Sequence, residues 1–170
     1  MIPSLANPPS QIEYCKVVVF QILGHWLALP TSAVLKITRL PAPVNGGVEA
    51  SRLTMWNNCP LVFLDLHALL APKQYKLPPP ENHSSGCLRF VIIAQSQATE
   101  PCAIPVDKPP TLMEIPLSEI QIMPPHYHQV IGGIAGHVAV LPHQGSVLNI
   151  LLLNLRQALN MTLQEFQRGV

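Results

Sequence analysis

The chain has 170 residues, the length of one ordinary domain, and this leaves room for a substantial core. Only 11% of the residues are charged and 48% are hydrophobic, which excludes a disordered chain. Ten Lys and Arg stand against nine Asp and Glu, and this balance argues against a nucleic-acid-binding protein. So few charges suggest that part of the surface is covered by partner proteins.

The beginning of the chain does not read as a secretion signal. Residues 1–10 contain three prolines and no Lys or Arg, whereas a signal peptide has a positively charged start and then an apolar stretch. The longest apolar run, 147–155, includes two asparagines and is too short to span a bilayer. We therefore expect a cytoplasmic protein with no direct membrane insertion.

The first half of the chain reads as short strands. Residues 15–23 are rich in β-branched residues and stop at Gly24, and 25–29 read as the returning strand of a hairpin. Residues 33–40 alternate between apolar and polar, which indicates a half-buried strand. A further pair of strands is predicted at 52–56 and 60–66. The turn between them is Asn57-Asn58, because Asn tolerates positive φ. Asp65 is a plausible cap for a short helix at 65–70.

After a proline-rich linker the same pattern resumes. The predicted strands are 87–94, 102–107, 111–115, 136–141 and 147–154, with a loop at 121–130. A helix is predicted over 155–167, where leucines recur at helical spacing. Many short strands without strand–helix alternation predict a mostly-β fold, and short strands between Gly and Pro suit small barrels.

Two segments of the chain look alike. VFLDLHALL at 62–70 and LLLNLRQAL at 151–159 are each an apolar strand, then Asp or Asn, then a leucine-rich helix. A strand that enters a helix through such a residue has a capped exit. The repetition suggests two copies of one small barrel.

The order of these motifs resembles the CheW-like domain of bacterial chemotaxis adaptors. The matching stretches are VVVFQILG (17–24), WLALP (26–30), AVLKITRLP (33–41), PLVFLDL (60–66), LRFVIIA (88–94), AIPVD (103–107) and IPLSEIQIMPP (115–125). The resemblance covers roughly residues 15–159 and implies two small interlocked SH3-like five-stranded β-barrels with short helices and a C-terminal helix. On this basis we expect a flexible segment at 1–14 and a single domain at 15–170. We expect its first barrel at 15–72, its linker at 73–86, its second barrel at 87–154 and its helix at 155–168.

The resemblance also implies a function and its partners. It predicts a non-enzymatic signalling adaptor that couples a CheA-type histidine kinase to the cytoplasmic tip of a chemoreceptor, a methyl-accepting protein. Such an adaptor serves chemotaxis, phototaxis or pilus motility, needs no cofactor, and is recruited to membrane receptor arrays. The expected partner-binding residues lie on one strand and one turn: Val34, Lys36, Ile37, Arg39, Leu40, Trp56, Asn57 and Asn58.

The sequence departs from the family at this turn. The family usually has Asn-Leu-Arg-Gly there, and the matching residues 55–58 place Asn57 at the arginine and Asn58 at the glycine. An amide does not replace the charge or the donor fork of a guanidinium. The choice of partner is therefore open.

The alternative reading is a metal- or thiol-dependent enzyme that uses the histidine-rich second half. His126 and His128 could place two imidazoles on one side of a strand, with His137 or His143 as a third zinc ligand. The simpler interpretation is solvated loop histidines between prolines. The four cysteines are far apart and form no Cys-x-x-Cys pair, so we expect buried thiols, not a metal site or a nucleophile.

Overall fold

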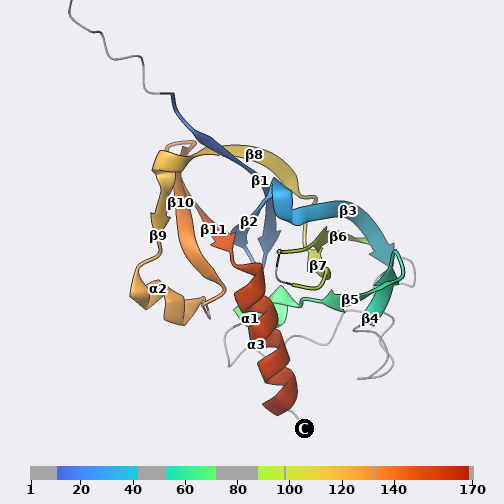
Figure 1. The fold of residues 1–170 in the computed structure, drawn as a ribbon. Coiled ribbons are helices and arrows are strands. Elements are labelled where there is room, and N and C mark those ends of the chain that lie inside the picture. The colour runs from blue at the N-terminus through green and yellow to red at the C-terminus, as the bar shows by residue number, and fades with distance from the viewer. Residues whose placement is uncertain (1–10, 42–52, 72–87, 98, 132, 169–170) are drawn as a thin grey trace, which may run out of the picture.

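The computed structural model describes residues 11–41, 53–71, 88–97, 99–131 and 133–168 (Figure 1). The strands are β1 (Tyr14–Ile22), β2 (His25–Pro30), β3 (Val34–Pro41), β4 (Leu53–Trp56), β5 (Cys59–Phe63), β6 (Leu88–Ala94), β7 (Cys102–Val106), β8 (Thr111–Pro116), β9 (Ile120–Ile122), β10 (Ala135–His143) and β11 (Ser146–Leu153). The helices are α1 (Leu66–Leu70), α2 (Pro125–Val130) and α3 (Leu155–Arg168), with two short 3-10 turns, η1 (Thr31–Ala33) and η2 (Leu117–Glu119). None of these helices is long and apolar enough to cross a membrane.

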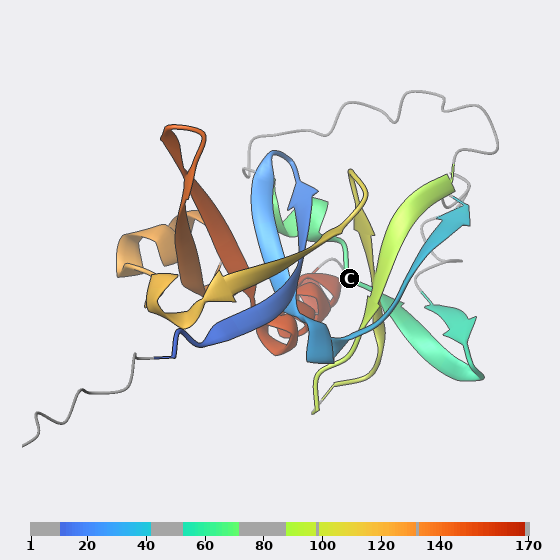
Figure 2. The same ribbon diagram turned by 90° about the horizontal axis from the view of Figure 1, so that it is seen from above.

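The strands form two sheets, and the prediction of a mostly-β fold is confirmed. Sheet A has the order β8-β1-β2-β11-β10-β9, and sheet B has the order β3-β6-β7-β5-β4. In Figure 2 the two sheets lie side by side with α3 between them. Strands β8 and β9 are the opposite edges of sheet A, yet only the three residues of η2 separate them in the chain. Sheet A must therefore curl until its edges meet, which makes a five-stranded barrel if β8 and β9 count as one bent strand.

The two halves of the chain exchange hairpins. Hairpin β1–β2 comes from the first half but belongs to sheet A, whose other strands come from the second half. Strands β6 and β7 come from the second half but lie in the middle of sheet B. The barrels therefore interlock, but the sheets do not divide the chain into 15–72 and 87–154 as predicted. The predicted linker 73–86 lies outside the described residues.

The strand registers show that the two sheets repeat each other. Each contains one parallel contact, in which Leu152 lies opposite Ala28 and Phe63 lies opposite Ala103. Leu152 and Phe63 each stand two residues before the Asx residue of the sequence repeat. Aligning the two alanines matches LALP (27–30) with CAIP (102–105) and matches β1 with β6.

The same alignment extends to the strands β3 and β8. Ile37 pairs with Ile92 on β6, and Leu112 pairs with Val18 on β1, so KITRLP (36–41) corresponds to TLMEIP (111–116). Ile37 and Leu112 therefore occupy equivalent positions in the two sheets. The next residue on the same face is Arg39 in sheet B and Glu114 in sheet A.

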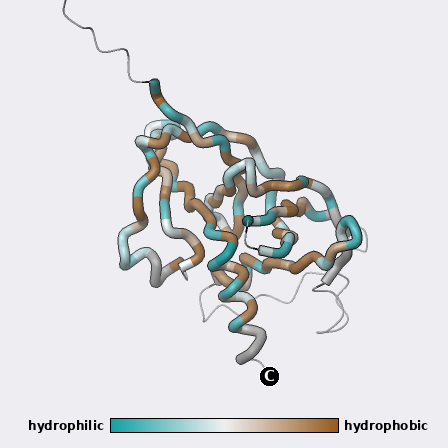
Figure 3. The backbone as a smooth tube through the Cα atoms, in the orientation of Figure 1, coloured by the Kyte–Doolittle hydropathy of each residue, from teal (hydrophilic) through white to brown (hydrophobic). Residues whose placement is uncertain are grey.

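The main core lies where the two sheets meet. It contains one face of the hairpin β1–β2, including Phe20, together with Ile92 and Ile104 of sheet B and Leu155 of α3. A second cluster around Val17, Val19, Ala28 and Ile150 fills the other face of sheet A. A smaller one, formed by Leu61, Val91, Ile93 and Ala103, lies on the other face of sheet B. Apolar stretches of the chain run along these strands at the centre of the molecule (Figure 3).

The two predicted helix caps are confirmed. Asp65 Oδ1 accepts from the amide of Ala68 at 3.2 Å, and Asn154 Oδ1 accepts from the amide of Gln157 at 3.1 Å. Each side chain satisfies one of the free amides at the start of its helix. Helices α1 and α3 contact each other and contribute to the same core, so the sequence repeat is also a structural one.

The segment 121–130 is not the predicted loop. Its first residues complete β9, and Pro125 begins helix α2. Proline suits the first position of a helix because the amide it lacks would have no partner there. The two prolines were interpreted as loop residues, although one of them marks a helix start.

Three hairpin turns have two consecutive residues with positive φ, and the predicted Asn57-Asn58 turn is one of them. In the turn between β1 and β2, Leu23 adopts φ 50° before Gly24. We expect Leu23→Asn to raise the free energy of unfolding by about 0.5–1 kcal/mol, because Asn tolerates this conformation better than Leu. Urea unfolding measures the change. The reverse substitution, Asn57→Leu at φ 49°, should lower stability, and equal stability of all three proteins would contradict the argument.

Candidate functional site

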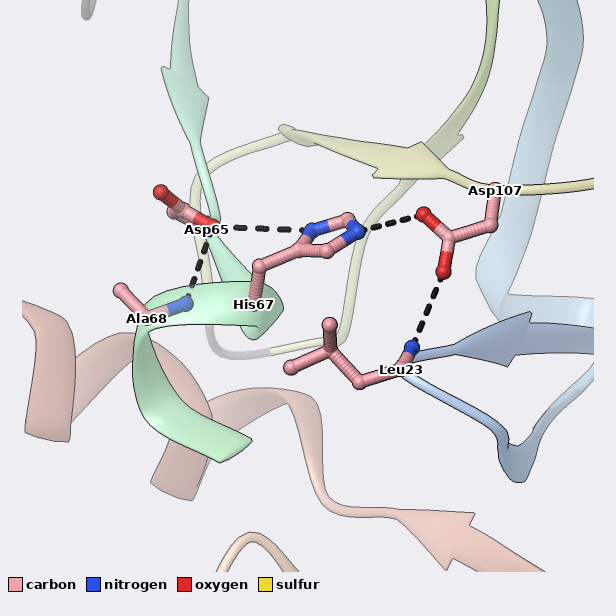
Figure 4. Close-up of polar contacts among 5 residues, drawn as sticks. All are labelled: Leu23, Asp65, His67, Ala68 and Asp107. Atoms are coloured by element: carbon pink, nitrogen blue, oxygen red, sulfur yellow. Dashed lines mark hydrogen bonds and ion pairs between the residues drawn. The ribbon is translucent and has the colours of Figure 1, made fainter. Parts of the chain in front are cut away.

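A histidine held between two carboxylates lies where α1, β7 and the β1–β2 turn meet (Figure 4). His67 Nε2 is 2.5 Å from Asp107 Oδ1, and His67 Nδ1 is 3.7 Å from Asp65 Oδ1. The second oxygen of Asp107 accepts from the backbone amide of Leu23 at 2.9 Å. Both oxygens of Asp107 are thus engaged within the protein. The cluster ties the exchanged hairpin to sheet B and to α1.

The zinc hypothesis for the second half is wrong in its geometry. His126 and His128 lie on α2 and not on a strand. Positions two apart on an α-helix are about 200° apart around its axis, so the helix does not place these two residues on one side as a strand would. The ring of His126 instead lies 4.5 Å from that of Tyr127. Among the described residues, no group of three His, Cys, Asp or Glu side chains could hold a metal ion.

The thiol hypothesis finds no support in the described cysteines. Cys102 is buried in the main core, and burial raises its pKa to about 12. The thiolate is the nucleophile, so a thiol with this pKa is inert near neutral pH. Cys59 is exposed at the start of β5, and Cys15 is partly buried.

These environments predict different thiol reactivities. In a Cys15→Ser, Cys87→Ser double variant, we expect one thiol, Cys59, to react with Ellman's reagent at pH 8 within minutes. Cys102 should react only after denaturant unfolds the chain, because the folded protein keeps it protonated and out of solvent. Two thiols that react rapidly in the folded protein would contradict this.

The predicted strand surface lies on β3, an edge of sheet B. Ile37 is 42% exposed and the neighbouring Leu35 is 44% exposed, so Ile37 is not a core residue. The guanidinium carbon of Arg39 lies over the Phe90 ring, 4.4 Å from its centroid. Val34 packs against the main core instead of facing solvent, and the side chain of Leu40 lies outside the described ones.

The structure does not assemble the predicted residues into one face. Opposite residues of an antiparallel pair project to the same side. Ile37 pairs with Ile92 and so faces the main core side, whereas Lys36 pairs with Ile93 and faces the other side.

The predicted turn belongs to the other edge strand of sheet B. Strands β3 and β4 are opposite edges of sheet B. Trp56, at the end of β4, is partly buried against the smaller sheet B cluster. Asn57 and Asn58 are exposed at the turn.

Leu112, the counterpart of Ile37 in sheet A, was not among the predicted site residues and is 70% exposed. Its partner Val18 belongs to the main core, as does Ile92, the partner of Ile37. Ile37 and Leu112 are thus exposed apolar residues at equivalent positions of the two sheets, each paired with a residue of the main core, and we call this pair the apolar rim. The likeness of KITRLP to TLMEIP could have identified it from the sequence.

A groove of about 500 Å³ lies at the junction of the two sheets. It is lined by the end of β2, η1, the loop after β6, the start of β10 and the start of α3. Its lining residues are Leu29, Pro30, Ser32, Ala33, Gln95, Ser96, Gln97, Gly136, His137, Leu152, Leu153, Asn154, Leu155 and Arg156. Its apolar part is leucine-rich, and its lining has one arginine and no carboxylate. We call it the junction groove.

Comparison with known proteins shows which fold this architecture has. No protein-family model matches the sequence, and no curated protein matches it. Among solved structures, the scaffolding protein TtCheW from Thermoanaerobacter tengcongensis matches with a TM-score of 0.59 and 14% sequence identity. The match covers 84% of this chain and 90% of that one. The chain has a CheW-like fold.

The CheW-like fold accounts for the main features of the architecture. Two interlocked β units and a C-terminal helix were expected from the resemblance, and the mostly-β architecture with two sheets is confirmed. At 14% identity the likeness establishes the fold and leaves each surface residue to be judged by its own chemistry. We therefore take the apolar rim and the junction groove as the candidate surfaces of this chain.

Proposed function

We propose that the chain is a non-enzymatic signalling adaptor that couples a chemoreceptor to a CheA-type histidine kinase. The single observation that carries the proposal is the CheW-like fold, which TtCheW, described as a scaffolding protein, shares over most of both chains. The inert Cys102 and the helical placement of His126 and His128 give the enzyme alternative no specific support.

The two named surfaces suit an adaptor with more than one partner. The apolar rim offers exposed side chains from both sheets, and exposed apolar groups beside a core are typical of protein interfaces. The junction groove lies where the sheets meet α3, so a segment bound there would contact both barrels. We propose that partner proteins bind at these two surfaces, and that the predicted turn at Trp56, Asn57 and Asn58 is a third contact.

The proposed mechanism is positional. An adaptor that binds receptor and kinase together raises the effective concentration of each for the other. A signal then passes because the receptor state changes which kinase conformation is favoured. In this model the chain is cytoplasmic, supplies no chemistry and reaches the membrane only through its receptor.

The experiment is a reconstitution with the kinase and a receptor cytoplasmic fragment from the source organism. Kinase autophosphorylation and co-sedimentation with receptor-bearing vesicles are measured with and without the chain. We expect both to rise when the chain is added. If the folded chain binds neither protein and changes neither measurement, the proposed function is wrong.

The turn can be tested separately. We expect Trp56→Ala to weaken the binding of one partner, and Asn57→Arg to strengthen or redirect it, since a guanidinium restores the charge typical of the family. Both variants should remain folded under the binding conditions, which circular dichroism checks, although Trp56→Ala lowers the free energy of unfolding because its ring packs against the smaller sheet B cluster. Unchanged affinity of both variants would exclude the turn from the interface.

A further inference from the structure

Sheet B differs from sheet A in its charge. The strands of sheet B contain three basic residues, Lys36, Arg39 and Arg89, and no acidic residue. All three lie on the edge strand β3 or on its neighbour β6, and all three are exposed. We call them the basic strip. Among the described residues, no carboxylate lies within ion-pair distance of any of them.

In sheet A, the charge at the position equivalent to Arg39 is neutralised by an ion pair. Glu114 of sheet A stands at the position equivalent to Arg39, and it forms an ion pair with Lys16 across the β1–β8 pair at 3.5 Å. The position equivalent to Lys16 is Phe90, whose ring packs under the Arg39 guanidinium. A stacked ring orients the guanidinium but carries no negative charge of its own. Among the described residues, sheet A thus forms a cross-strand charge pair at this position, and sheet B does not.

The basic strip borders the β3 edge on both faces of the sheet. Arg39 projects on the face of the main core, while Lys36 and Arg89 project on the other face. Between them the exposed Leu35 and Ile37 add apolar surface. A segment lying along this edge would meet positive charge on either side and apolar side chains in the middle.

We propose that the β3 edge of sheet B binds an acidic, apolar segment of a partner protein. The carboxylates of the segment pair with the basic strip, as Glu114 pairs with Lys16 within sheet A. The apolar side chains of the segment cover Leu35 and Ile37. Electrostatic complementarity of this kind selects the partner and speeds its association. The inference deepens the proposed adaptor function and rests on it for the existence of a partner.

The edge also has features that prevent unwanted strand pairing. Lys36 is charged, and the register shifts between Val34 and Lys36 as in a β-bulge. Both are known devices against edge-to-edge aggregation. If they served only that purpose, the strip would bind no acidic segment, and this is one outcome of the test.

The test uses the full chain labelled with ¹⁵N and an eight-residue peptide of alternating Glu and Val. We expect amide shifts confined to β3 and β6, and binding that weakens as salt rises from about 20 to about 300 mM. A Lys–Val peptide of equal length should not bind. Absence of binding, shifts elsewhere, or equal binding of the Lys–Val peptide or of a single-stranded oligonucleotide would overturn the inference.

The repeat supplies a matched pair of variants. Arg39→Gln should weaken peptide binding about two- to fivefold, the range of one exposed charge contact, and removal of all three charges should weaken it further. Glu114→Gln at the equivalent position of sheet A should leave it unchanged. If the chain couples kinase and receptor but ignores the acidic peptide, only this inference fails. If the peptide binds but no coupling occurs, the proposed function fails instead.

Discussion

Replacing Phe20 by alanine should lower the free energy of unfolding by about 3–5 kcal/mol, the usual range for a large aromatic residue removed from a packed core. Phe20 is 1% exposed and lies on β1 in the exchanged hairpin. Its ring belongs to the main core, which also contains Ile92 and Ile104 of sheet B. The cavity therefore opens between the two sheets and not inside one of them.

The effect should reach both sheets together. Because each half of the chain completes the sheet of the other, we expect amide protection to fall equally on β6 in sheet B and on β11 in sheet A. Urea unfolding gives the free energy, and native-state hydrogen exchange gives its distribution. Val147→Ala, at a 62% exposed position of β11, is the control and should cost less than about 0.5 kcal/mol. Loss of protection in sheet A alone would show that the sheets are independent.

Much of the fold follows from local patterns in the sequence. Strands β1, β2, β5 and β7 were predicted to within a few residues, because each is mainly apolar and bounded by Gly, Pro or Asn. Asp65 was recognised as a cap because a helix start needs a side-chain acceptor there, and the same need explains Asn154. These features depend on neighbours in the chain, which a sequence displays directly.

The pairing of strands that are far apart in the chain could not be predicted from local patterns. Residues 14–30 alone do not indicate that β2 pairs with β11 instead of with the strands that follow it. The two barrels were therefore predicted in chain order. The bulge between Val34 and Lys36 is equally hidden. Alternation predicted a half-buried strand at 33–40, yet both Leu35 and Ile37 are exposed.

The candidate site illustrates the same limit. Ile37 and Arg39 were identified from the strand that carries them, and both are exposed. Leu112 was missed because its importance comes only from its equivalence to Ile37, and that equivalence requires the registers of two separate strand pairs. The junction groove takes residues from four separate segments of the chain, and no single motif contains it.

The apolar rim gives the sharpest test of the proposed interface. We expect Ile37→Asp and Leu112→Asp each to weaken binding of the receptor fragment or the kinase by about tenfold, and the double variant by about a hundredfold. A carboxylate there would be buried unpaired in the complex, which costs more than the lost apolar contact. Titration calorimetry with each partner measures the change.

Folding should survive these substitutions, because both side chains already face solvent, at 42% and 70% exposure. Val147→Asp, on the β10–β11 hairpin, introduces the same charge at an exposed apolar position and should bind as the wild type does. If only Ile37→Asp weakens binding, the interface belongs to sheet B alone, and Leu112 is merely exposed. If neither variant weakens binding to either partner, the rim is not an interface. If both do, and to similar extents, a partner contacts the two equivalent positions together, and the internal repeat has been used twice to build one binding surface.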